Sequence, residues 1–561
     1  NMEKTYHSLK DFELSYGKNA IERANDFQQY IEQLNDFGCK SYWITSHTGI
    51  GSTMAIEGFN EPVIAFISND YLGMSQREET KQAGIDAIKK YGTGACAAQV
   101  IGGYLDIHQQ LEKEIASFVG QEEAILFSSG FGANAGILRA LLGQNDIALI
   151  DPYIHTSAMA GLKGTNIKRI GHNDLEYLEK VLKEVKGQYQ TKLVIIDGVY
   201  SQDGDLSLLP EIITLCKTYE TMLMLDDAHG IGVMGANGRG TAEYYNCLGQ
   251  IDIITGTFSK SFGCVGGFAA ASKKIIQYLK FYADSNVFSA APTPQVTASI
   301  LKALEIIKKE PQIRTKLWEN TNYLRKRLKE EGFDIGKSVS PIFPIMIRDN
   351  KKVYEIAKML QEKGIFTIGI VYPAVRTKEA RLRVSVLATH KLEQLESLVN
   401  TLNDINKNII MKERRKRRSA KDIKESIINA ATHLIETEGF SNLTVTGIMR
   451  QAEIEPVQFY NRYDDLNKFI DEYVKKYDYW FSDIVKSQKQ SSNDKALYMN
   501  ILVGLFQSLS ENKIMQELLK WELANNNETS QRTAQLRELH TLPLCQKFSN
   551  IFSNTDIDIV T

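Results

Sequence analysis

Between about residues 60 and 400, short apolar segments of the chain alternate with longer amphipathic ones. The apolar segments are typical of buried strands, and they span residues 122–129, 146–152, 192–201, 221–230 and 252–259. Segments with apolar residues at helical spacing lie between them, at residues 108–120, 173–187 and 210–220. This alternation predicts an α/β fold in which helices cover both faces of a mostly parallel sheet.

The pattern changes abruptly at residue 412. The run KERRKRR begins there, and the glycine-punctuated α/β pattern gives way to successive helices up to residue 561. Such a shift in composition and charge is typical of a domain boundary. We therefore expect five parts, which are an N-terminal helical arm (1–60), a large domain (61–300), a small domain (301–407), a basic linker (408–420) and a separate all-α domain (421–561).

Composition narrows the class of protein. A chain of 561 residues is too long for one ordinary core, and its 24% charged and 43% hydrophobic residues are typical of a globular protein in water. The formal net charge of −2 predicts no general affinity for polyanions. No segment approaches the ~18 apolar residues of a membrane span, and the first residues lack the apolar core of a signal peptide, so we expect a cytoplasmic protein.

The six cysteines are scattered along the chain, without a CxxC pair and without a metal-binding spacing to histidine. We interpret them as reduced thiols and expect no metal site. Candidate chemistry must therefore come from other side chains.

That chemistry lies where predicted strands end, which is the edge at which open α/β sheets bind ligands. Ser201, Asp226, His229 and Lys260 all follow such strands. Lys260 lies in TGTFSKSFGCVGG, a run with no carboxylate to pair with it. It is either a surface lysine in a glycine-rich loop or a Schiff-base lysine, whose amine must be neutral to attack an aldehyde.

The motif LDDAHG favours the second interpretation. Asp226 at a strand end can hold a pyridine nitrogen protonated, which makes the ring an electron sink, and His229 can reach a phenolic oxygen of that ring. His155, in DPYIHTSAM after another strand, is placed to stack on a flat ring. Each of these residues alone has an ordinary structural role as its alternative, but together they favour a bound pyridine-ring cofactor.

A phosphate site is predicted beside these residues. SSGFGANAG (128–136) ends a strand and opens a helix, so Gly130 and Phe131 can offer main-chain N–H groups and the helix dipole to an anion. A glycine-rich turn alone is weak evidence, but Thr257 and Ser259 add hydroxyl donors next to the lysine. The cofactor is therefore expected to carry a phosphate as well as a ring.

These residues lie in motifs that resemble those of the α-oxoamine synthases, pyridoxal-phosphate enzymes of aminotransferase fold type I. The family includes 8-amino-7-oxononanoate synthase, glycine C-acetyltransferase, 5-aminolevulinate synthase and serine palmitoyltransferase. The matches run in the family's order from about residue 60 to residue 405, and they are SNDYLGMS, YGTGACAAQVIGGYLDIHQQLE, SSGFGAN, DPYIHTSAM, HND, DGVYSQDGD, LDDAHGIGVMGANGRG, GTFSKSFGCVGG, FSAAPTP and ARLRVSVLATH.

The resemblance implies pyridoxal 5′-phosphate as the cofactor. It implies an acyltransferase that condenses an amino acid with an acyl-CoA, or with an acyl carrier protein, usually with decarboxylation to an α-aminoketone. Lys260 would form the internal aldimine and later remove the Cα proton. The resemblance assigns the cofactor ring to the catalytic His155, Asp226 and His229 with Ser201, the phosphate to Gly130, Phe131, Thr257 and Ser259, and the substrate carboxylate to Asn69 and Arg383. Ser289 would reach the phosphate of the neighbouring subunit, which implies a homodimer with shared active sites.

Two positions depart from the family pattern. Gln99, in ACAAQ at the expected acyl-CoA entrance, stands where a basic or imidazole side chain is common, so the acyl preference is not carried over from any member. Arg376, in YPAVR, stands where a proline is frequent. It either helps to hold a carboxylate or is simply solvated.

Residues 421–474 resemble the N-terminal helix-turn-helix of TetR-type regulators. The resemblance implies DNA contacts within residues 412–468, with base contacts expected from Thr446, Gln458 and Tyr460. The pattern is weakened by acidic side chains that would repel phosphates, at Glu453, Glu455, Asp464 and Asp465. The alternative for this tail is a helical dimerisation or partner-binding appendage.

Two functions from different classes are therefore open. One is a synthase that carries a regulator-like tail. The other is a transcription regulator whose aminotransferase-fold part senses pyridoxal phosphate or an amino acid without turnover. A sensor has no need for Asn69, His155 and Arg383, so the motifs favour the enzyme.

Overall fold

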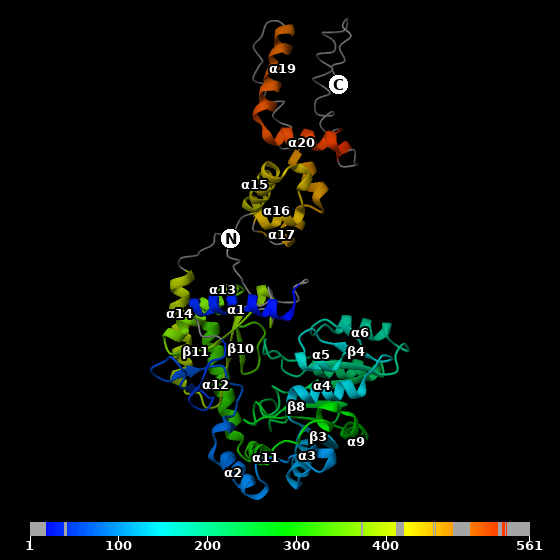
Figure 1. Ribbon diagram of the computed structural model, residues 1–561, viewed down its shortest axis with the longest axis vertical. Coiled ribbons are helices and arrows are strands. Elements are labelled where there is room, and N and C mark those ends of the chain that lie inside the picture. Colours follow the sequence, from blue (N-terminus) through cyan, green and yellow to red (C-terminus); the bar gives the residue numbers. More distant parts are fainter. Residues whose placement is uncertain are drawn as a thin grey trace. The chain divides into compact units, whose positions relative to one another are not determined.

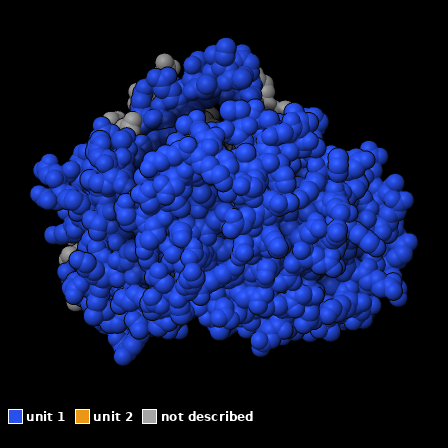
Figure 2. Space-filling view, turned by 90° about the horizontal axis from the view of Figure 1, so that it is seen from below, with its two compact units in different colours: residues 1–412 blue, residues 413–561 orange. Residues whose placement is uncertain are grey.

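The structure is a computed structural model that describes residues 18–38, 42–371, 374–410, 420–452, 454, 456–474, 494–525, 530–532 and 535. The chain forms two compact units, residues 1–412 and 413–561 (Figure 1). In a space-filling view the first unit is one continuous body (Figure 2). The division falls within the expected linker 408–420, although helix α14 (Leu392–Ile410) continues into the first residues of that segment.

A seven-stranded sheet lies at the centre of the first unit (Figure 1). The strand order is β3 (Glu123–Phe127), β9 (Gly267–Ala271), β8 (Ile253–Thr257), β7 (Met222–Asp226), β6 (Lys192–Asp197), β4 (Ile147–Ile150) and β5 (Asn166–Arg169). The strands from β8 to β5 run parallel, whereas β9 is antiparallel to both of its neighbours. The expected α/β fold with a mostly parallel sheet is confirmed, and the sheet is mixed toward one edge.

Strand β3, at one edge of the sheet, is buried on both faces because its alternate side chains enter two different apolar cores. Ile125 and Phe127 of β3 enter a core that also contains side chains of α4 (Gly130–Leu141), α5 (Thr156–Gly161) and α9 (Lys273–Tyr282). Leu126 of the same strand enters the opposite core, with α3 (Asp106–Val119), α6 (Leu175–Glu184) and α7 (Leu209–Thr218). Helices therefore cover the sheet on both sides, as the sequence pattern predicts.

Other segments of this unit form two smaller sheets. Helices α11 (Pro294–Lys309) and α12 (Pro311–Glu330) lead into an antiparallel sheet of β10 (Ile342–Met346), β13 (Arg381–Ser385) and β12 (Ile368–Ile370). The other small sheet joins β1 (Thr53–Met54), β2 (Val63–Ala65) and β11 (Ile365–Phe366). Helix α13 (Asn350–Glu362) contacts strands of both small sheets.

Two of the expected domain limits divide parts that the structure connects. Strand β1 pairs with β2 across residue 60, and helix α11 continues across residue 300. Strand pairing joins residues that no local pattern connects, so the sequence does not mark these limits. The remaining elements are α1 (Ala20–Phe37), α2 (Glu78–Tyr91), α8 (Thr241–Tyr244), α10 (Asp284–Val287), and the 3-10 turns η2 (Met74–Gln76), η3 (Gln99–Ile101) and η4 (Thr377–Glu379).

In the second unit the described elements are helices and short turns. Its helices are α15 (Ala420–Glu438), α16 (Val445–Ala452), α17 (Pro456–Tyr460), residues 466–474, α19 (Asp494–Glu511) and α20 (Lys513–Ala524), with a 3-10 turn η5 (Phe440–Asn442). Ile427, Ile448, Phe459 and Met515 come from four of these helices and share one apolar core. The basic run 412–418, Glu453 and Glu455 lie outside the described residues.

Three further observations concern the described residues only. No helix among them combines the length and the apolar character that a membrane crossing needs. They contain no cluster of three side chains that could ligate a metal ion. Four cysteines lie in the described part of the chain and are free thiols, namely Cys96, Cys216, Cys247 and Cys264.

Gly267, the first residue of β9, allows an unusually close contact between the sheet and the start of α4. A Cβ atom at this position would lie 2.6 Å from the Cα and N atoms of Gly130 and from the carbonyl oxygen of Ser129. These are main-chain atoms, which cannot rotate away as the end of a flexible side chain can. The glycine therefore sets the distance between strand and helix.

We expect Gly267→Ala to lower the free energy of unfolding by about 1–3 kcal/mol, because the extra methyl overpacks this contact. The measurement is thermal unfolding followed by circular dichroism. Gly51→Ala is the matched control, since a Cβ at Gly51 meets no atom within 4 Å. A melting temperature of Gly267→Ala equal to that of the control would contradict the expected contact.

Candidate functional site

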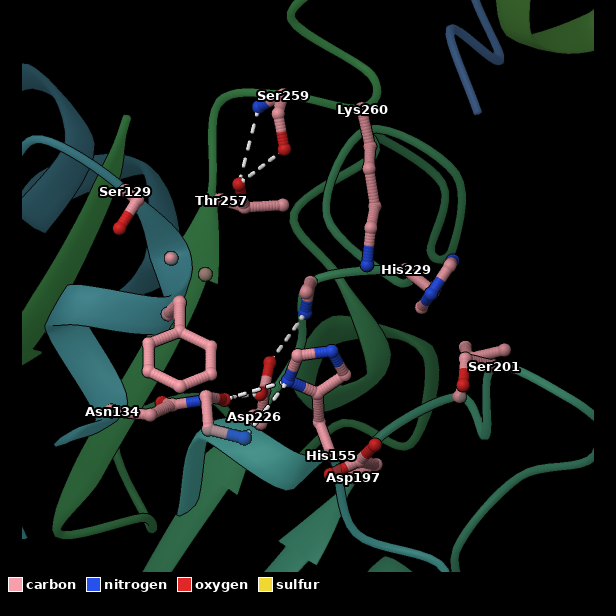
Figure 3. A pocket seen from close by; sticks show the side chains of 16 residues that line it. Ser129, Asn134, His155, Asp197, Ser201, Asp226, His229, Thr257, Ser259 and Lys260 are labelled. Atoms are coloured by element: carbon pink, nitrogen blue, oxygen red, sulfur yellow. Dashed lines mark hydrogen bonds between the residues drawn. The ribbon is translucent and has the colours of Figure 1, made fainter. Parts of the chain in front are cut away.

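A cavity of about 260 Å³ lies at the carboxyl end of the parallel strands (Figure 3). It is lined by Ser129, Gly130, Phe131, Asn134, His155, Ser157, Asp197, Val199, Ser201, Asp226, Ala228, His229, Gly256, Thr257, Ser259 and Lys260. All residues expected to hold the cofactor are in this set except Ser289. The parallel topology explains the gathering, because loops that are far apart in sequence leave the sheet at one edge.

Lys260 follows β8 and extends into the cavity, with its Nζ toward His229 and His155 (Figure 3). Burial lowers the pKa of Lys260 to about 8; the charge of Asp226 opposes this shift, and that of Arg383 adds to it. A substantial part of the amine is therefore neutral near physiological pH. This is the state that a nucleophilic or proton-accepting lysine requires.

The carboxylate of Asp226, at the end of β7, is held by two N–H donors. Asn134 Nδ2 donates to Oδ2 at 2.6 Å, and the main-chain N–H of Ala228 donates to Oδ1 at 3.1 Å. Asn134 lies one turn into α4, so the helix that opens at Gly130 also orients this carboxylate. Asp226 is therefore fixed in the wall of the cavity, where it can face a protonated ring nitrogen.

A chain of hydrogen bonds continues from Asp226 to His155. Asn134 Nδ2 also donates to Ser157 Oγ at 2.9 Å, and Ser157 Oγ lies 2.7 Å from His155 Nδ1. The main-chain N–H of Ser157 also donates to Nδ1, at 3.3 Å, so Nδ1 accepts and the neutral ring carries its hydrogen on Nε2. Burial lowers the pKa of His155, which keeps the ring uncharged.

His229 lies on the turn after β7 and contacts a tyrosine from a distant segment. Its Nδ1 is 2.8 Å from the hydroxyl of Tyr71, in the SNDYLG motif. Burial lowers the pKa of His229 well below its ordinary value and raises the pKa of Tyr71 to about 12. Both groups are therefore neutral, so the pair can exchange a hydrogen bond without adding charge to the cavity.

Hydroxyl groups gather at the other end of the cavity, where Ser129, Thr257 and Ser259 lie together (Figure 3). Thr257 Oγ1 is 2.7 Å from Ser259 Oγ, and Ser129 Oγ caps α4 by accepting the N–H of Gly132 at 2.9 Å. The first N–H groups of α4 have no carbonyl of the helix to bond and carry the positive end of its dipole. This end of the cavity is therefore suited to an anion.

Arg383 and Asn69 meet beside the cavity, although neither lines it. Arg383 is buried on β13, and its Nη2 donates to Asn69 Oδ1 at 3.2 Å. Its other bonds go to the carbonyl oxygen of Ser201 at 2.7 Å and to Ser385 Oγ at 2.8 Å. None of these recorded partners is a carboxylate. The guanidinium charge is therefore suited to the carboxylate of a ligand.

Several residues of the site were not singled out from the sequence. Asn134 lies in the SSGFGAN motif and Tyr71 in the SNDYLGMS motif, and Asn134 stands four residues after Gly130, the spacing of one helix face. Asp197 pairs in register with Asp226 on the neighbouring strand. Burial and the charge of Asp226 raise the pKa of Asp197 well above its ordinary value. A search for polar residues at every predicted strand end would have included Asp197.

The other residues expected to act lie outside this cavity. Ser289 follows α10 and contributes nothing to the cavity of its own chain. Gln99 Nε2 donates to the carbonyl of Leu126 at 3.1 Å, and Arg376 is exposed, which agrees with the solvated interpretation. In the second unit Thr446 is exposed near the start of α16, and Tyr460 is exposed at the end of α17, the helix that also carries Gln458.

Comparison with known proteins agrees with this geometry. Residues 61–402 match the family model described as aminotransferase class I and II. The chain is 40% identical to a serine palmitoyltransferase of Sphingobacterium spiritivorum over 391 residues, which are 69% of this chain and 97% of that protein. It is 37% identical to an 8-amino-7-oxononanoate synthase of Thermoanaerobacter pseudethanolicus over 392 residues, 70% of this chain and 99% of that protein.

Solved structures give the same answer. A serine palmitoyltransferase of Sphingomonas wittichii superposes with a TM-score of 0.67 and 28% identity, covering 70% of this chain and 99% of that one. A structure titled as SPT with the PLP internal aldimine matches with the same TM-score, identity and coverage. The family match ends at residue 402, before the second unit begins. The chain therefore belongs to the aminotransferase class I and II family and, with these relatives, to its α-oxoamine synthases.

Proposed function

We propose that this protein condenses an amino acid with an acyl thioester, with loss of carbon dioxide, to give an α-aminoketone. The relatives are serine palmitoyltransferases and 8-amino-7-oxononanoate synthases, so the enzyme class is a pyridoxal-phosphate-dependent acyltransferase. One observation carries the proposal. A lysine with a lowered pKa and a fixed carboxylate line one cavity, and an arginine without a recorded carboxylate partner lies beside it.

The residues present fit pyridoxal 5′-phosphate. The buried Oδ1 of Asn134, beside Asp226, has no hydrogen-bond partner. At the anion end a Cβ at Gly130 would lie 3.0 Å from the Cβ of Thr257, so the glycine keeps this end of the cavity open. We assign the ring nitrogen to Asp226 and the ring face to His155. We assign the ring oxygen to His229 and Ser201. The residues that would bind the phosphate are Gly130, Phe131, Thr257 and Ser259. When bound, the cofactor supplies an electron sink for the bond cleavages at Cα.

The chain's own residues then perform binding and proton transfer. Asn69 and Arg383 hold the carboxylate of the amino acid, which fixes the direction of the Cα–H bond. Lys260 Nζ takes the Cα proton, because its lowered pKa leaves a neutral amine inside the cavity. CoA or an acyl carrier protein delivers the acyl group and leaves as a free thiol.

We propose further that the active form is a homodimer. Phe131 lines the cavity and yet is 49% exposed, and Phe288, next to Ser289, is 88% exposed. Large apolar side chains exposed to this degree, one of them in the lining of the cavity, are typical of a surface that a partner covers. A second copy would cover them and bring its Ser289 to the phosphate end of the cavity.

The alternative is a sensor that binds the cofactor or an amino acid without turnover. It requires Lys260 and Asp226 but not a lysine poised for proton transfer beside the Asn69–Arg383 pair. The position of Arg383, bonded to the Ser201 carbonyl at the edge of the cavity, favours the enzyme. Release of a thiol separates the two functions directly.

For the second unit we propose DNA binding through the helix pair α16–α17. The supporting observation is that Ile448 and Phe459 anchor this pair in the apolar core of the second unit, while Thr446 and Tyr460 stay exposed. Asp464 and Asp465 follow α17 and oppose a phosphate backbone. The competing role is a dimerisation or partner-binding appendage.

Lys260→Ala is expected to lower thiol release by about 10³-fold or more, because the variant has no base for the Cα proton. The assay follows thiol release by the cofactor-loaded protein, with glycine, alanine and serine crossed with acyl-CoA thioesters of increasing chain length. Lys192→Ala is the control, since Lys192 begins β6 and donates to the carbonyl of Tyr219 at 2.8 Å, away from the cavity lining. Turnover by Lys260→Ala at the wild-type rate would refute the proposed role.

The amine of Lys260 is expected to react with acetic anhydride with a midpoint near pH 8. Its lowered pKa means that it is protonated below this pH and nucleophilic above it, whereas surface lysines react with a midpoint near 10.4. Trace labelling of the cofactor-free protein from pH 6 to 11, read by peptide mass spectrometry, measures both classes in one sample. A Lys260 midpoint equal to that of the surface lysines would contradict the effect of burial.

The full chain is expected to shift DNA from upstream of its own gene in a gel, with an affinity that falls steeply as salt rises. Tyr460→Ala should weaken this binding by about tenfold, the value of one base contact. A chain that ends at Lys412 should release thiol at the wild-type rate and shift no DNA. Salt-independent association, or none at low salt, would favour the appendage.

A further inference from the structure

The loop 198–208 connects the cofactor cavity with strand β13. It follows β6 and carries Ser201, which lines the cavity and whose carbonyl accepts a hydrogen bond from Arg383 Nε at 2.7 Å. Arg381, two residues earlier on β13, donates to the carbonyl of Gln202 at 3.1 Å and to Asp203 Oδ1 at 2.5 Å. The position of this loop therefore sets the position of the arginine that faces the substrate.

His172, in the HND motif, holds the other side of this loop. Its Nε2 lies 2.9 Å from Asp205 Oδ2, and its Nδ1 lies 3.0 Å from Asp151 Oδ2, just after β4. A carboxylate only accepts, so both ring nitrogens must carry hydrogen and the ring must be an imidazolium. The charged ring thus joins the end of a strand to the loop by two charge-assisted bonds.

Asn173, the next residue of the motif, forms two further hydrogen bonds with the same loop. Asn173 Nδ2 donates to the carbonyl of Leu206 at 2.9 Å, and its Oδ1 accepts the N–H of Leu208 at 3.1 Å. Asn173 has a positive φ of 51°, a conformation that asparagine tolerates better than most residues. The two residues 172 and 173 therefore bind the loop at three successive points.

The surroundings of His172 keep its charge. Burial lowers the pKa of His172, but the bonds and charges of Asp151 and Asp205 outweigh burial and raise it to about 9. Tyr200 donates its hydroxyl to Asp151 Oδ2 at 2.9 Å, and the rings of Tyr153 and Tyr200 lie 4.6 and 4.5 Å from the imidazole. These four side chains are the titratable groups that the structure records in contact with the ring.

We propose that His172 is a positioning residue for the synthase reaction. As an imidazolium it ties the end of β4 to the loop 198–208 and thereby fixes the Ser201 carbonyl that holds Arg383 in place to receive the substrate carboxylate. The tie itself is a property of the fold, whereas its effect on the substrate rests on the proposed function.

The pH dependence of this tie follows from the raised pKa. The stability that the tie contributes is fully present below about pH 6.5, the ordinary pKa of histidine. It is lost as the pH rises through about 9, the raised pKa of His172. A neutral imidazole has a single N–H, so one of the two carboxylates then loses its donor. The loop is expected to loosen in alkaline solution.

The test uses the full-length, cofactor-loaded protein with His172→Gln, because a glutamine amide cannot bridge both carboxylates as an imidazolium does. Hydrogen–deuterium exchange of residues 198–208 is measured at pH 7 and pH 10 and expressed as protection, which removes the intrinsic effect of pH. Wild-type protection should fall about tenfold or more between these pH values, the size of one lost bond to a charged group. In the His172→Gln variant the protection of this loop should be low at both pH 7 and pH 10.

His108→Gln is the matched control. Its ring also bonds through both nitrogens, to the N–H of Leu105 at 3.0 Å and to the carbonyl of Pro292 at 2.7 Å, but to no recorded carboxylate. This variant should follow the wild-type pH dependence in the loop. Equal protection of the loop in His172→Gln and wild type at both pH values would overturn the tie.

Asp205→Asn provides a second variant that keeps the size of the side chain. It removes one of the two charges that raise the pKa of His172, so the loss of protection should move to lower pH. A general loss of packing would lower protection without moving its midpoint. A midpoint that stays at the wild-type pH overturns the assigned role of the charge.

The effect on the substrate is measured separately, as the dissociation constant of an amino acid from the change in cofactor absorbance. His172→Gln should weaken binding about tenfold at pH 7 relative to wild type and to His108→Gln. If His172→Gln binds the amino acid as tightly as wild type although its loop protection is reduced, the proposed effect of His172 on Arg383 is overturned. If wild type responds to no amino acid, the proposed function fails, whereas the exchange experiment still decides the tie.

Discussion

The site depends on a neutral amine and a carboxylate being held in one small cavity. Removal of water lowers the pKa of Lys260, and the nearby charge of Asp226 limits how far it falls. Two N–H donors hold Asp226, so the carboxylate does not turn toward the lysine to form an ion pair. An ion pair there would keep the amine protonated and unreactive. The hydrogen bonds from Asn134 to Ser157 and from Ser157 to His155 serve this arrangement, because they hold in place the asparagine that fixes the carboxylate.

The topology of the sheet explains how so many segments contribute to one cavity. Strands β4, β6, β7 and β8 run parallel, so the loops that follow them all begin at the same edge. The antiparallel β9 returns the chain beside β8 and α4, where Gly267 permits direct main-chain contact. Arg383 of strand β13, which belongs to a different sheet, contacts the cavity wall through the carbonyl of Ser201 and also bonds Asn69. The loop 198–208 therefore links the large sheet to the strand of the arginine that we propose binds the substrate.

The sequence predicts those parts of the site that depend on local pattern. Lys260, Asp226 and Thr257 follow apolar strands, and the direction of a buried parallel sheet brings such residues together. The bond from Asn134 to Asp226 was not predictable in this way, because it depends on how α4 packs across the strand ends. The direction of β9 was not predictable either, since the residues GFAAA carry no signal of parallel or antiparallel pairing. The role proposed for Ser289 requires a second copy of the chain, which a single sequence does not describe.

The small volume of the cavity implies that different residues determine the accepted acyl chain length and the proton transfer. At about 260 Å³ it is smaller than the roughly 300–1,000 Å³ of typical pockets for drug-sized ligands. If the proposed cofactor and amino acid occupy this cavity, a long acyl chain extends beyond it and lies against another surface of the protein. Substitutions on that surface can then change which chain length is accepted while leaving the proton-transfer machinery intact. Substrate range in such a scaffold is free to diverge during evolution faster than the chemistry does.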